Sequence, residues 1–119
     1  MNHEPFREMN ERERWLIRKL LTPEFPGGDE LAQQLETAKV RAIDEDGCLE
    51  FLVSSDIRAE HVKYRVPTEG EYEDPDGITV HVLLHVVDLK AKELEFFRED
   101  SAPRRTWPNP DLVRVFAPE

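Results

Sequence analysis

The sequence contains few of the residues that form covalent cross-links or nucleotide-binding loops. Its 119 residues include a single cysteine, Cys48, so the chain cannot form an internal disulfide. We interpret Cys48 as a small core residue, because it lies in a strand-like pattern. The 5 glycines form no phosphate-binding loop and no Gly-x-Gly-x-x-Gly motif, and no serine lies in a Gly-x-Ser-x-Gly context. These absences favour a binding protein without a cofactor over an enzyme.

Long apolar segments are also missing. No stretch reaches the roughly 18 apolar residues that a membrane-spanning helix requires. The N-terminal segment Met-Asn-His-Glu-Pro lacks the basic region and the apolar region of a secretory signal. We therefore expect a cytoplasmic protein with no membrane partner.

The charge balance is strongly acidic. The chain has 26 Asp and Glu against 16 Lys and Arg, which gives a net charge of −10 and a pI near 4.9. Such a field repels nucleic acids and favours a basic protein partner. Arg104 and Arg105 lie beside Trp107, a pattern that can stack bases. Against the overall charge this pattern is weak, so we interpret Trp107 as an anchor for the C-terminal segment and expect no nucleic-acid partner.

Two helices are expected near the N-terminus. Asn10 and Glu13 have the spacing of a capping box, and apolar residues follow at helical spacing until Thr22-Pro23 ends the helix. Asp29 is expected to cap a second helix that continues to about Ala38. We treat residues 1–119 as a single domain in which 1–9 and 117–119 are loose.

The remaining sequence has the period of β-structure. The expected strands are 40–43, 48–53, 62–66, 78–88 and 93–98, with a further edge strand in the tail from 100 to 119. Turns are expected at 44–47, 74–77 and 89–92, and 69–77 is expected to be an acidic loop. The nearly unbroken apolar run 78–88 is typical of a central strand that is buried on both faces.

These elements predict an α+β fold, with two N-terminal helices packed on an antiparallel sheet of about five strands. The second face of the sheet also requires cover. The C-terminal segment or a second copy of the chain could supply it, so both a monomer and a homodimer are compatible with the sequence.

His81 and His85 are the first candidate site residues. They lie four residues apart on the expected central strand, which places them on the same face but roughly 13 Å from each other. Because one ion cannot reach both imidazoles at that separation, we expect no shared metal. Each histidine could instead join residues of neighbouring strands, such as Glu50, Arg65 or Glu95.

A cleft on this face is one possible location for a site. There, His81 and His85 would be the polar groups, and Tyr64 and Arg65 would lie beside them. Sheet-face histidines that hydrogen-bond to their neighbours are the alternative.

The second candidate is the acidic segment that contains Glu69, Glu71, Glu73, Asp74 and Asp76. Its spacing does not match a calcium-binding loop of the EF-hand type, because the positions that should hold acidic ligands include Tyr72 and Leu83. We expect either a solvated loop or a docking surface in which Glu71, Glu73 and Asp74 attract a basic partner.

Several segments together resemble a known family. They are Trp15-Leu-Ile-Arg-Lys-Leu-Leu21, Tyr64-Arg-Val-Pro67, Asp74-Pro-Asp-Gly77, His81-Val-Leu-Leu-His-Val86, Glu93-Leu-Glu95 and Arg98-Glu-Asp100. They are similar to a family of small uncharacterised bacterial α+β proteins of about this length, a domain of unknown function. The resemblance covers roughly residues 10–110. It implies bacterial origin and one compact domain, and it transfers no catalytic residue.

The general character of a short acidic α+β chain is also similar to immunity proteins that neutralise secreted bacterial toxins. The sequence therefore predicts a non-enzymatic protein-binding module, for which an immunity-like protein is one form. The alternative is a small-molecule-binding protein or small enzyme that uses a sheet-face cleft around His81 and His85.

Overall fold

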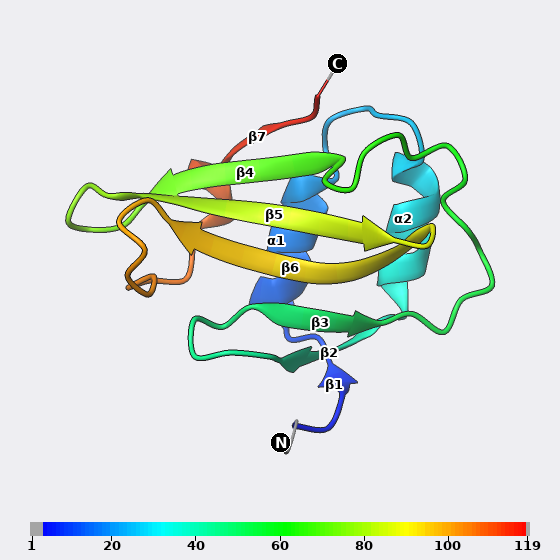
Figure 1. Ribbon diagram of the computed structural model, residues 1–119, viewed down its shortest axis with the longest axis horizontal. Helices are drawn as coiled ribbons and strands as arrows, with labels where there is room; N and C mark the ends of the chain where they lie inside the picture. Colours follow the sequence, from blue (N-terminus) through cyan, green and yellow to red (C-terminus); the bar gives the residue numbers. More distant parts are fainter. Residues whose placement is uncertain (1–3, 119) are drawn as a thin grey trace.

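A single antiparallel sheet of seven strands dominates the computed structural model, which describes residues 4–118 (Figure 1). The strands are β1 (Arg7–Glu8), β2 (Lys39–Ala42), β3 (Leu49–Leu52), β4 (Thr68–Glu73), β5 (Thr79–Val87), β6 (Lys90–Arg98) and β7 (Arg114–Phe116), in the spatial order β1-β2-β3-β6-β5-β4-β7. The helices are α1 (Glu11–Leu20), α2 (Gly28–Glu36) and the short 3₁₀ helix η1 (Pro110–Leu112).

The predicted fold class was wrong. We expected α+β with about five strands, whereas the structure has seven strands and two short helices of 10 and 9 residues, so it is mostly β. One additional strand is β1, which lies within the segment 1–9 that we expected to be loose and pairs with β2. Residues 1–3 and 119 of the expected loose ends lie outside the described residues.

Two further elements were assigned wrongly. The expected strand 62–66 is a loop, and β4 occupies most of the expected acidic loop 69–77. The acidic residues of β4 alternate with buried Thr68, Gly70 and Tyr72, so the segment has a clear period of two. A strand tolerates three glutamates when they all point to a face that water can reach. The turn at 74–77 was correct, because the Gly77 amide donates to the Asp74 carbonyl at 2.8 Å.

Both helices cover the same face of the sheet (Figure 1). The predicted capping box of α1 is confirmed, since Asn10 accepts from the Glu13 amide and Glu13 accepts from the Asn10 amide. The core lies between this helical layer and the sheet, and Leu16, Leu20 and Leu31 of the helices belong to it together with the buried residues of β5. No helix in residues 4–118 has the length and apolar content needed to cross a membrane.

The sequence predicted a central strand at 78–88, but β5 lies one place from the middle of the sheet, between β6 and β4, and it is not buried on both faces. Along Thr79–Val87 buried residues alternate strictly with half-buried ones. Val80, Val82 and Leu84 face the helices and are fully buried. His81 and His85 point to the other side, where no helix among the described residues lies. An apolar run alone cannot show whether a strand is buried on one face or on both, since β-branched residues occur in both kinds of strand.

Cys48 and Trp107 have the structural roles that the sequence predicted. Cys48 is 3% exposed in the core, and burial raises the pKa of its thiol to about 12, so it is an inert thiol at neutral pH. The ring of Trp107 packs on Phe96 at 5.3 Å between ring centres. The Arg104 guanidinium lies over both rings, which fixes the C-terminal segment to the sheet.

The turn between β5 and β6 was expected at 89–92 and is in fact formed by Asp88 and Leu89. Both residues have positive φ, at 52° and 66°, without a glycine to mark the position. Gln34 of α2 holds this turn, because its Nε2 donates to the Leu89 carbonyl and its Oε1 accepts from the Ala91 amide, each at 2.9 Å. Gln34 is completely buried, so its polar atoms depend on these bonds.

A buried arginine joins the other end of the sheet to the C-terminal segment. The side chain of Arg98 is 2% exposed and that of Asp74 is fully buried, and they form a 2.9 Å ion pair. Asp76 and Asp100 complete the contacts of the guanidinium. Asp74 also accepts from the amides of Arg105 and Thr106. Asp74 is therefore a structural residue and is not exposed to a partner.

We expect Asp74→Ala to lower the free energy of unfolding by about 3 kcal/mol, because two amides lose their buried acceptor and the buried guanidinium of Arg98 loses one of its three carboxylate partners. Chemical denaturation measures this loss. Asp100→Ala is the matched control, since it removes a 41% exposed carboxylate from the same guanidinium and should cost clearly less. Equal losses in the two variants would contradict the role of the buried pair.

The same network predicts the response to acid. The hydrogen bond from Arg98 lowers the pKa of Asp100 to about 2 and also holds the pKa of Asp76 below its usual value. Burial alone would raise the pKa of Asp74, but bonds from the Arg105 amide, Arg98 and Thr106 outweigh it and lower that pKa. Groups with lowered pKa stabilise the fold above their unfolded pKa and lose this effect as the pH falls through the folded value.

The free energy of unfolding should therefore decrease between about pH 5 and pH 2, and Arg98→Met should flatten this decrease. Denaturant titrations over a pH series test the difference between the two proteins. Arg105→Met, which removes a 64% exposed cation near Asp76, is the control and should keep most of the slope.

Candidate functional site

The face of the sheet opposite the helices forms a continuous surface, which we call the open face. It carries Arg41, Glu50, Leu52, Glu69, Glu71, Glu73, His81, Leu83, His85, Glu93, Glu95, Phe97, Arg114 and Phe116, as the strand register shows. Residues directly opposite each other on antiparallel strands share a face and can contact each other. All the predicted site residues on strands lie here, with Glu71 and Glu73 on β4 and the two histidines on β5.

One cross-strand row contains His81. Its register partners are Glu71 on β4 and Phe97 on β6, and Glu71 in turn pairs with Arg114 on β7. Nε2 of His81 lies 3.0 Å from Glu99, and Nδ1 lies 3.9 Å from Glu71. The two carboxylates therefore approach opposite nitrogens of the ring. Arg114 also contacts Glu73 at 2.8 Å, so both predicted docking glutamates of β4 already have a cation.

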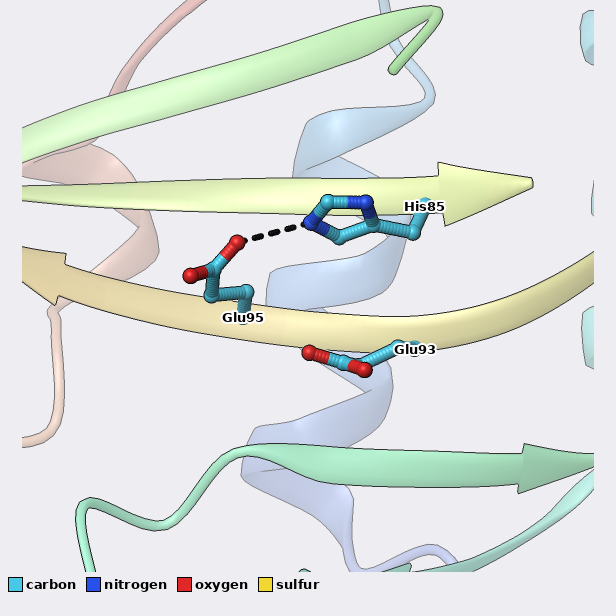
Figure 2. Close-up of side chains that lie close together, drawn as sticks. All are labelled: His85, Glu93 and Glu95. Carbon is cyan, nitrogen blue, oxygen red and sulfur yellow. Dashed lines mark hydrogen bonds and ion pairs between the residues drawn. The ribbon is translucent and has the colours of Figure 1, made fainter. Parts of the chain in front are cut away.

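A second row contains His85. It lies opposite Glu93 on β6, and Glu93 lies opposite Glu50 on β3. Glu50 pairs with Arg41 and Lys92, whereas Glu93 forms no hydrogen bond or ion pair within residues 4–118. Glu95 is diagonal to His85 and contacts it at 2.7 Å (Figure 2). His85, Glu93 and Glu95 thus form a group of three ionisable side chains on the adjacent strands β5 and β6.

Arg65 completes the surroundings of His85. Its Nε donates to Nδ1 of His85 at 3.1 Å, and its carbonyl accepts from the Val86 amide at 2.7 Å. Because a donor faces Nδ1, the ring proton lies on Nε2, from which it is donated to Glu95. A β-bulge lies between His85 and Val86, where the ladder with β6 shifts register. Bulges of this kind re-aim side chains and are frequent next to functional sites.

The predicted site residues are thus divided among three places. The structure brings His85 together with Arg65 and Glu95, two of the three neighbours that the sequence suggested. His81 has different partners, so the two histidines do not share one set of contacts. Tyr64 is 45% exposed on the loop that carries Arg65 and lines a shallow depression beside it. Asp74 is buried away from this face.

Glu93 is the member of the cluster that the sequence analysis missed. The signal was present, since Glu93 and Glu95 are two apart on a strand and therefore share a face. What the sequence could not supply was the register that sets Glu93 opposite His85. Ligand atoms of His85, Glu93 and Glu95 lie within 4.8 Å of one another, and this group is the one potential metal cluster found within residues 4–118.

We expect His85 to be the Nε2–H tautomer in the metal-free protein, because the Arg65 guanidinium excludes a proton from Nδ1. Nitrogen–proton correlation spectra of the imidazole rings, recorded where histidines are neutral, identify the tautomer. Arg65→Ala should produce a mixture of tautomers. The exposed His61 serves as the internal control in both proteins. A protonated Nδ1 in the unsubstituted chain would contradict this arrangement.

Comparisons with known proteins place the chain in a family without describing an activity. The family model described as "Domain of unknown function (DUF6984)" matches residues 6–108. No curated protein and no solved structure matches the chain. The bacterial origin that the resemblance implied therefore stays a prediction. Since the match includes six of the seven strands and both α-helices, the chain belongs to this family of small domains of unknown function.

Proposed function

We propose that the protein is a non-enzymatic protein-binding module whose open face docks a basic protein surface. The observation that carries this proposal is the one-sided cover of the sheet. Two helices bury one face, whereas within the described residues no helix covers the other, although it presents large apolar side chains. Leu52 and Phe97 are each 46% exposed, and Phe116 is 42% exposed. Exposed apolar groups among charged ones are typical of protein interfaces.

Charge supports a basic occupant. Glu69 lies on β4 between Phe116 and Leu83 in the strand register and has no ion-pair partner among residues 4–118. A lysine or arginine on a partner would supply the missing cation next to an apolar contact. The net charge of −10 would attract such a surface from a distance.

The docking residues differ from those that the acidic segment suggested. Asp74 is buried, and Glu71 and Glu73 are paired with Arg114, so Glu69 and the apolar groups become the principal contacts. An immunity-like protein that covers a basic toxin surface is one form of this module, and we propose the cytoplasm as its location.

The test begins with capture of a partner by the tagged chain at low and at high salt. Binding of the captured protein is then measured with the double variant Glu69→Gln/Phe97→Ala. We expect binding about tenfold weaker or more, with a smaller dependence on salt, because both a charge and a central apolar contact are lost.

Glu11→Gln/Glu36→Gln is the matched control, since it neutralises two exposed glutamates on the helical side. This variant should bind within about twofold of the unsubstituted chain. Equal weakening in both double variants, or an acidic captured protein whose binding does not depend on salt, would contradict docking of a basic surface on the open face.

A further inference from the structure

We infer that His85, Glu93 and Glu95 form a binding site for one divalent transition-metal ion, with Zn²⁺ as the best match. The three side chains come from adjacent strands and point to the same side of the sheet (Figure 2). Their ligand atoms lie within 4.8 Å of one another, and all three residues are half-buried. Strand-borne ligands on a paired ladder are held in place by the backbone hydrogen bonds, which limits the entropy lost on binding.

Glu93 is the observation that points to a cation. It is half-buried, has no hydrogen-bond or ion-pair partner within residues 4–118, and faces the carboxylate of Glu95. Two carboxylates this close repel each other, and partial burial strengthens the repulsion. The arginine and lysine of this row are bound to Glu50 instead. A bound divalent cation would neutralise both glutamates at once.

His81 shows why the cluster at His85 is different. Both histidines lie on β5, face the same side and have two glutamates nearby. At His81 the glutamates approach opposite ring nitrogens, so no single ion can contact both carboxylates and the ring. At His85, Nε2 contacts Glu95, and one ring nitrogen has ligand atoms of both carboxylates within 4.8 Å.

The donor set selects the kind of ion. One imidazole with two carboxylates suits Zn²⁺ or a similar transition metal, whereas Mg²⁺ and Ca²⁺ prefer oxygen ligands alone. Tetrahedral Zn²⁺ with bonds near 2.1 Å requires ligand atoms about 3.4 Å apart. Small rotations of the two glutamate side chains would bring the ligand atoms, which lie within 4.8 Å of one another, to this shorter separation. Three protein ligands leave the fourth position on the open face for water.

Metal binding changes the tautomer of His85. Nε2 gives up its proton to bind the ion, and Nδ1 takes up a proton, so the ring releases none overall. The N–H at Nδ1 can no longer accept from Arg65, which must move away. Arg65 therefore competes with the metal, both through this bond and through its positive charge. Its removal should strengthen metal binding.

The experiment is calorimetric titration of Zn²⁺ into the full chain after treatment with a chelator. We expect one ion per chain. Glu93→Gln keeps the shape of the side chain and should weaken binding by at least about tenfold, and His85→Ala should do the same. Arg65→Ala should bind more tightly than the unsubstituted chain. Imidazole nitrogen spectra should show the proton of His85 move from Nε2 to Nδ1 on addition of Zn²⁺.

His81→Ala is the matched control and should bind Zn²⁺ within about twofold of the unsubstituted chain. The inference is overturned if the chain takes up no Zn²⁺, if Glu93→Gln binds as well as the unsubstituted chain, or if His81→Ala weakens binding equally. The result is independent of the docking proposal, because no partner is present. The variant Glu69→Gln/Phe97→Ala should retain the metal.

Discussion

The constraint on which this structure depends is that two short helices must bury a seven-stranded sheet from one side. The long strands therefore place mainly apolar side chains on the face toward the helices and mainly polar side chains on the opposite face. On β5, valines and leucines face the helices while histidines alternate with them on the opposite side. On β4, Thr68, Gly70 and Tyr72 face inward and glutamates face outward. The strict period of two converts a linear sequence into one dry surface and one polar surface.

The open face is organised by cross-strand rows. Charges of opposite sign lie next to each other where a basic residue is present, as with Arg114 and Glu71 or Arg41 and Glu50. Glu69 and Glu93 are exceptions within the described residues, since each is a carboxylate without a cation. A fold has no need of unpaired carboxylates beside apolar or like-charged groups. We propose that they mark the positions at which this face binds a partner or an ion.

Local sequence signals predicted several elements whose causes are local, although the cap expected at Asp29 was wrong, because α2 begins at Gly28 and its N-cap is Gly27. The capping box at Asn10 and the turn glycines Gly47 and Gly77 depend on residues a few positions apart, and the structure contains each of them. Elements set by distant partners were missed or misassigned. β1 is two residues long and exists because β2 offers an edge, and the pattern at 62–66 lacks a neighbouring strand.

The same distinction applies to the candidate site. His81 and His85 were recognisable as polar residues within an apolar strand. Their partners depended on register, which placed Glu93 opposite His85, and on a loop that brings Arg65 to its ring. The buried ion pair between Arg98 and Asp74 was not predicted for the same reason, since charged residues in a sequence are ordinarily assigned to the protein surface.

The turn at Asp88 and Leu89 has a consequence for how the molecule opens. Two non-glycine residues with positive φ cost about 1 kcal/mol or more each. The turn of the β5–β6 hairpin is therefore unfavourable without contacts from the rest of the structure. The Leu89 carbonyl accepts from Gln34 and from the Ala59 amide, and these bonds offset the cost. If α2 leaves the sheet, the turn loses the Gln34 bond at once. The helix and the hairpin end should therefore open as one cooperative unit, although more than fifty residues of chain separate Gln34 from Leu89.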